Sequence, residues 1–145
     1  MMLDKLRSLL FEETHQAEPT LSALSAASAL MFEVMWADHD VDEIEVEAMK
    51  QHLAAVFTVA PEQFDAILVE TRRLHDQAVG LHEFTSVLND ILDAQQKYLI
   101  VEALWQIAYA DQQIDVMEEH IIRRIADLMY VSHKDFIRAK LTSRP

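Results

Sequence analysis

Two stretches of the chain decide the fold, and they carry the same pattern. Residues 36–45 read WADHDVDEIE and residues 109–118 read YADQQIDVME, at an offset of 73 positions. Each has an aromatic residue followed by Ala-Asp, then a β-branched residue, an Asp and, three positions later, a Glu. Because Asp-x-x-Glu has the spacing of a capping box, each stretch predicts a tight turn that leads directly into a helix.

The sequence around these two turns has helical spacing almost throughout. Apolar residues recur every three or four positions, while one glycine and three prolines are too few for the turns of a sheet protein. The predicted apolar faces lie within residues 3–10, 21–35, 48–57, 64–74, 84–91, 98–108 and 117–129, and an eighth helix follows an N-cap at Ser132. We expect Gly80 to end the fourth helix, and Ile91 and Met117 to face inward.

The resemblance between the two turns extends into their flanks and predicts two similar halves. These halves cover roughly residues 20–78 and 94–141. Downstream of the turns the offset slips to 72, and the matching pairs are Leu53 with Ile125, Val56 with Leu128, Val59 with Val131 and Phe64 with Phe136. No linker-like stretch divides the chain. We therefore expect residues 1–145 to form one all-α domain, a bundle of seven or eight helices with two pseudo-symmetric halves.

The composition of the chain argues against several classes of function. The formal net charge of −13 disfavours nucleic-acid binding, because a phosphate backbone would be repelled. The longest uncharged run has fourteen residues, which is short of the ~20 that a transmembrane helix needs. The absence of cysteine excludes disulfides and thiolate metal sites. With no basic leader segment, a cytoplasmic protein is expected.

The two acidic turns support two interpretations. In the structural one, Asp42 and Asp115 are N-caps and the following Glu residues complete capping boxes. In the functional one, the carboxylates converge near a helix N-terminus and hold a hard divalent cation such as Ca²⁺ or Mg²⁺. The candidate ligands are Asp38, Asp42 and Glu45 in the first turn and Asp111, Asp115 and Glu118 in the second.

Further residues define what such a cation site would be. His39 and Asp40 are possible extra ligands, and an imidazole would shift the preference toward a transition metal such as Zn²⁺. An EF-hand is excluded, because the first turn has Glu43 where that loop needs Gly and Met49 where it needs a bidentate Glu.

Three aromatic residues lie at the ends of the helices that precede the turns. Trp36, Trp105 and Tyr109 are suited to the core or its boundary. Alternatively, they line a partner-binding groove between the two halves, beside the carboxylates.

At these turns the sequence resembles the TerB family of tellurite-resistance proteins and a related domain of some J-domain co-chaperones. The positions that match the family's Ala-Asp-Gly-x-(Ile/Val)-x-x-x-Glu turn are Ala37, Asp38, Val41 and Glu45, and Ala110, Asp111, Ile114 and Glu118. The family's Gly is His39 in one half and Gln112 in the other. The resemblance implies an all-helical fold of two halves, a stress-linked role in membrane-associated complexes, and no established enzymatic chemistry.

We therefore expect a non-enzymatic module that binds a protein partner, and a divalent cation as its sole candidate cofactor, through the two acidic turns. Two alternatives stay open at this level. One is a metal-dependent enzyme that uses the clustered carboxylates, and the other is a purely structural helical subunit without a ligand.

Overall fold

The computed structural model describes residues 21–37, 41–110 and 112–145, and in these ranges it is all-helical, without a strand. The helices are α2 (Ala23–Trp36), α3 (Glu43–Phe57), α4 (Phe64–Asp76), α5 (Leu81–Ile91), α6 (Ala94–Ala108), α7 (Val116–Leu128) and α8 (His133–Ser143), with the 3-10 turn η1 (Pro61–Gln63) before α4. The predicted all-α fold is confirmed. The helix predicted at residues 3–10 lies outside the described residues.

The N-caps read from the sequence are present. Asp42 and Asp115 begin α3 and α7, and Ser132 begins α8, where its hydroxyl accepts a hydrogen bond from the Asp135 N–H at 3.1 Å. Asp93 begins α6 with a full capping box to Gln96. These side chains satisfy amide groups that have no partner inside the helix, which fixes where each helix begins.

The expectation for Gly80 is wrong. α4 ends at Asp76, and the left-handed residue after it is Ala78, with φ 57°. The Val79 N–H donates to the Leu74 carbonyl at 3.2 Å, which is a Schellman closure built without glycine. Gly80 has an extended backbone and serves as the N-cap of α5.

The core is centred on α2 and α6. α2 packs against α3, α4, α5, α6 and α7, and α6 also contacts α3, α7 and α8. A helix buried on most sides must be apolar on most sides, and α2 accordingly carries Glu33 as its one charged residue. Ile91 and Met117, which were expected to face inward, are exposed because each lies at the end of its helix, beyond the packed face.

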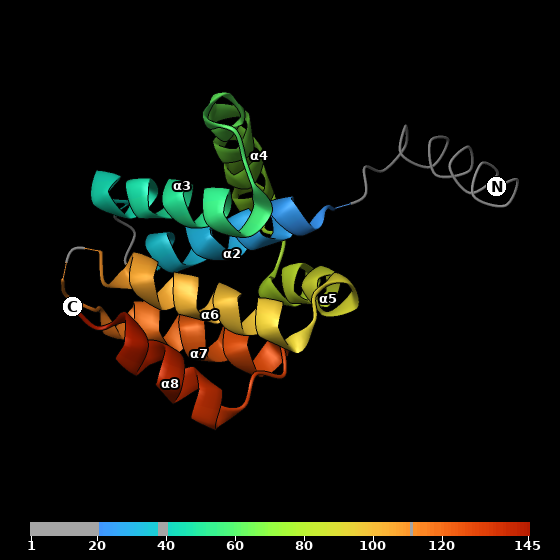
Figure 1. The fold of residues 1–145 in the computed structure, drawn as a ribbon. Helices are drawn as coiled ribbons and strands as arrows, with labels where there is room; N and C mark the ends of the chain where they lie inside the picture. The colour runs from blue at the N-terminus through green and yellow to red at the C-terminus, as the bar shows by residue number, and fades with distance from the viewer. Residues whose placement is uncertain (1–20, 38–40, 111) are drawn as a thin grey trace, which may run out of the picture.

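The arrangement follows the order of the chain. Figure 1 shows α2, α3 and α4 on one side of the molecule and α6, α7 and α8 on the other, with α5 beside them. In each group the first helix contacts both of the other two, α3 and α4 in one group and α7 and α8 in the other. The symmetry between the two halves stays a prediction. Within the described part of the chain, no helix is long and apolar enough to cross a bilayer.

Candidate interaction site at the acidic turns

The first acidic turn joins α2 to α3. Asp42 accepts a hydrogen bond from the Ile44 N–H at 3.0 Å, so its carboxylate caps α3. Glu45, in the first turn of that helix, is only 3% exposed. Three candidate ligands, Asp38, His39 and Asp40, lie outside the described residues.

The second acidic turn joins α6 to α7 and has a complete capping box. Asp115 accepts from the Met117 N–H at 2.7 Å, and Glu118 accepts from the Asp115 N–H at 3.0 Å. Glu118 is 4% exposed. Gln112 has a left-handed backbone with φ 69°, a conformation that favours glycine. This is the turn position at which the family pattern has Gly. Asp111 lies outside the described residues.

Both turns therefore bury a carboxylate. Glu45 and Glu118 are the two buried charged residues among those the structure describes. Burial of a carboxylate is costly unless hydrogen bonds or charges compensate it, and the capping bond of Glu118 supplies part of that compensation. These carboxylates lie at matching positions of the sequence repeat, and the capping box predicted for both turns is found at Asp115 and Glu118.

The described residues alone do not complete a cation site. They contain no group of three His, Asp or Glu side chains placed to hold a metal ion. A site of the predicted kind would need Asp38 or Asp111 in addition to the buried Glu and the capping Asp.

The predicted aromatic residues separate into two environments. Trp105 is fully buried and packs on Phe136 with ring centroids 5.2 Å apart, so it belongs to the core and cannot line a surface groove. Trp36 and Tyr109 are partly exposed. Each stacks on the aromatic residue one helical turn before it, Trp36 on Phe32 at 6.2 Å and Tyr109 on Trp105 at 6.0 Å.

A contact beside Trp36 escaped the sequence analysis. His75 of α4 lies edge-on against both Phe32 and Trp36, and its Nδ1 is 2.5 Å from an Oε2 of Glu33. These residues join α2 to α4 next to the first acidic turn. A separation of 42 positions between His75 and Glu33, without any local motif, gives no signal in the sequence.

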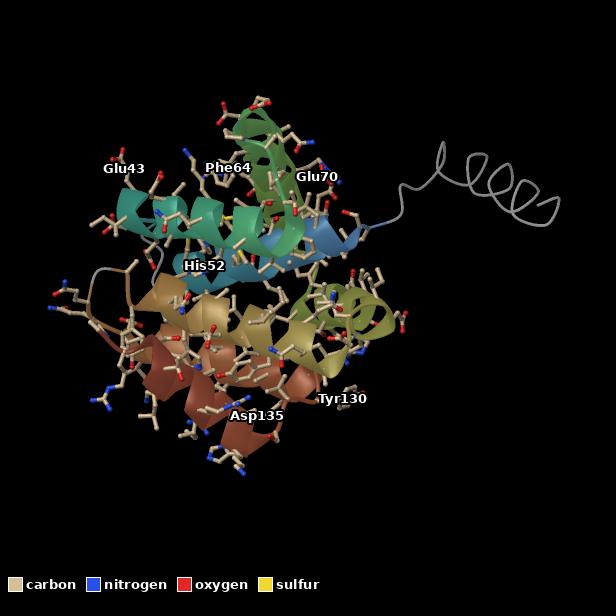
Figure 2. All side chains as sticks on the ribbon, in the orientation of Figure 1. Glu43, His52, Phe64, Glu70, Tyr130 and Asp135 are labelled. Carbon is tan, nitrogen blue, oxygen red and sulfur yellow. The ribbon has the colours of Figure 1, made fainter. Side chains whose placement is uncertain are left out.

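One histidine on α3 lies close enough to a carboxylate on α6 to interact with it electrostatically. His52 of α3 is partly buried, and burial lowers its pKa, while the nearby carboxylate of Glu102 on α6 opposes that shift. Figure 2 labels His52 on α3. The neutral imidazole is therefore the form favoured in the folded protein.

One comparison with known proteins gives a match. The family model described as Tellurite resistance protein TerB matches residues 24–141, which includes both acidic turns and all seven described α-helices except the first residue of α2 and the last two of α8. No curated protein and no solved structure matches the chain.

Proposed function

We propose that this chain, which belongs to the TerB family, is a non-enzymatic binding module associated with tellurite resistance and related stress. In this proposal it engages a protein partner through the two acidic turns. A divalent cation, Ca²⁺, Mg²⁺ or Zn²⁺, is held at the same turns.

The observation that supports this function best is the paired burial of Glu45 and Glu118. Each lies in the first turn of a helix that begins at a capping Asp, and Glu45 also follows a stretch rich in acidic residues. Caps alone do not require buried charge, since an exposed Glu at the third position can also reach back to the cap. Two charged carboxylates held inward at matching turns favour a role beyond capping.

The main alternative is a purely structural role. It is favoured by the hydrogen bonds that already engage Asp42, Asp115 and Glu118 in helix caps. An enzyme that uses the same carboxylates with a metal has no observation of its own in its favour. An experiment must therefore separate ligand binding from capping.

The test uses Glu45→Gln/Glu118→Gln, which removes two charges but keeps side-chain size and an oxygen that can accept the capping bond. The matched control is Glu62→Gln/Glu83→Gln, two exposed residues that also lie in the first turns of helices. Both variants and the parent are titrated with Ca²⁺, Mg²⁺, Zn²⁺ and Mn²⁺ by calorimetry. The same three proteins are cross-linked to their partners in cells, and the captured proteins are identified by mass spectrometry.

We expect weak cation binding, with Kd on the order of 10⁻⁴–10⁻³ M, because the turns lack a full EF-hand ligand set. At ~1 mM cation this corresponds to about 0.4–1.4 kcal/mol of added stability, measured against sodium at matched ionic strength. Loss of the cation effect and of a captured partner in the turn variant, but not in the control, supports the proposal. An identical response in all three proteins leaves the structural role as the answer.

A further inference from the structure

The helices of the first half enclose a groove beside the first acidic turn. α3 and α4 both pack on α2, yet within the described residues they make no extended contact with each other. Between them lies a hollow of about 250 Å³ with Phe32 and Met35 of α2 in its lining. The rest of its lining is Val41, Val46, Leu68, Val69 and Arg72. Four of these five residues are apolar.

Two further hollows extend this groove along α3. One of about 490 Å³ shares Val46 with the first, and one of about 350 Å³ shares Glu47 and Lys50 with the second. The last reaches Pro61 and Phe64 at the beginning of α4, and Figure 2 labels Phe64 there. The α3 residues in these linings run from Glu43 to Ala54, so the groove is roughly 17 Å long, the length of a helix of about three turns.

The corresponding space in the second half is bridged by an ion pair. Lys140 of α8 donates to Glu119 of α7 at 2.6 Å and so connects the two helices. In the repeat alignment Glu119 matches Val46 at the offset of 73, and Lys140 matches Leu68 at the offset of 72. The first half therefore has two apolar residues where the second half has an ion pair that connects its two helices.

Exposed apolar residues continue this surface. Ile44 is 54% exposed and borders the second hollow, and Val69 is 71% exposed and borders the first. When a partner covers the apolar side chains around a groove, their burial lowers the free energy of the complex. The described residues contain no sheet edge to which a strand could add, whereas a groove between two helices accommodates the apolar face of a third helix.

The charges around the groove indicate which charge an occupant should carry. Val41 lies inside residues 38–47, which carry six acidic residues and no basic one, and the whole chain has a net charge of −13. The linings of the three hollows hold two cations, Arg72 in the first and Lys50 in the other two, and the two acidic residues Glu43 and Glu47, of which Glu43 is at the end of the groove nearest the first acidic turn. Arg72 lies over the Phe32 ring at 5.8 Å. A helix with basic residues at the end nearest Val41 would complement this distribution.

We propose that the groove between α3 and α4 binds an amphipathic helix of a partner protein, with its apolar face on Val46, Leu68 and Val69 and its basic end against the first acidic turn. This inference rests on the proposed function, because it names the class of partner that the first acidic turn engages. It concerns the first half of the chain alone.

The test measures binding of a fluorescein-labelled 16-residue peptide by fluorescence anisotropy at physiological ionic strength. The peptide has leucine at helical i, i+3, i+4 and i+7 spacing and lysine and alanine elsewhere, with the lysines toward one end. Its control is an isomer of identical composition in which the leucines are scattered around the helix. The protein variant is Ile44→Gln/Val69→Gln, and its control is Met117→Gln/Leu141→Gln.

These control positions are matched to the test positions. Met117 and Leu141 correspond to Ile44 and Val69 in the repeat alignment and are 50% and 55% exposed. Because all four side chains lie on exposed helix surfaces, both double variants should keep the circular dichroism spectrum and melting temperature of the parent. Equal folding is the condition for comparing their affinities.

We expect the amphipathic peptide to bind at least tenfold more tightly than its scattered isomer, and Ile44→Gln/Val69→Gln to weaken that binding about tenfold. Met117→Gln/Leu141→Gln should change it less than twofold. Equal weakening in both variants, or equal binding of the two isomers, would overturn the proposal and indicate diffuse charge attraction.

Other occupants of the groove would give different results, and each would also overturn the proposal. A parent dimer that Ile44→Gln/Val69→Gln dissociates in sedimentation would show a second copy of the chain in the groove. Faster hydrogen exchange of residues 1–20 in that variant would show the chain's own N-terminal segment there. If the groove proposal fails while Glu45→Gln/Glu118→Gln still abolishes partner capture, the proposed function stands without it.

Discussion

Replacing the two capping aspartates tests whether the acidic turns are helix caps, ligand carboxylates, or both. In Asp115→Ala the Met117 N–H loses its acceptor at 2.7 Å, and the carboxylate charge near the N-terminus of α7 disappears. Loss of an N-cap costs about 0.5–2 kcal/mol, and the charge at a helix N-terminus contributes about 0.3–1 kcal/mol to the same total. The Asp115 backbone N–H is kept in the variant, so its bond to Glu118 can persist.

We expect Asp115→Ala to lower the free energy of unfolding by about 1.5 kcal/mol and Asp42→Ala, whose capping bond is longer at 3.0 Å, by about 1 kcal/mol. For a domain of this size a loss of 1.5 kcal/mol lowers Tm by roughly 3–6 °C. Urea unfolding followed by circular dichroism measures both values. The two sites lie on different helices, so their effects should add.

The control is Asp115→Asn, which keeps a good capping side chain and removes only the charge. It should retain most of the stability, since Asn and Asp are comparable N-caps. Neutral alanine variants at both positions would refute the capping argument. An Asn variant as unstable as the Ala variant would show that the carboxylate charge, and not the cap, stabilises the turn.

Three further predictions concern single residues or residue pairs. Thr58→Gly should raise the free energy of unfolding, measured in urea, by about 0.5–1 kcal/mol, because Thr58 is β-branched and has φ 55°. An unchanged free energy of unfolding would show that the backbone of Thr58 is not strained. The parent should lose stability as pH falls from 6.5 toward the lowered pKa of His52, because the unfolded chain takes up that proton first. His52→Gln should flatten this slope, and equal slopes would exclude His52 as its source. A double-mutant cycle on Glu119 and Lys140, with Gln and Met as replacements, should give a coupling of about 0.5–1 kcal/mol that falls with added salt.

The sequence predicts the helices and their N-caps well because both depend on local chemistry. Asp42, Asp115 and Ser132 bond to amides two or three positions away, so short motifs contain the whole interaction. The apolar spacing of residues 21–35 and 98–108 likewise predicts the two central helices. These features do not depend on which helices become neighbours.

Features that depend on packing between distant segments of the chain could not be predicted from the sequence. Gly80 is the one glycine of the chain, yet Ala78 takes the left-handed position and α4 ends four residues before Gly80. The sequence left Trp105 open between the core and a groove, and the packing of α6 against α7 and α8 places it in the core. The contact of His75 with Glu33 requires that α4 fold back on α2, which no local pattern encodes.

Comparison of the two halves separates scaffold from binding surface. Positions with one role in both halves, such as the capping Asp of each turn, maintain the shared helical arrangement. Lys50 over the Phe64 ring at 4.9 Å and Arg123 over the Phe136 ring at 5.1 Å belong to the same class. A difference between halves therefore needs a separate explanation. One difference between α3–α4 and α7–α8 is an apolar groove at the positions that hold an ion pair in the second half, and this groove lies next to the more acidic of the two turns. Because an ion pair connects the helices at the matching positions of the second half, the apolar residues of the groove in the first half favour the proposal that a partner helix covers them.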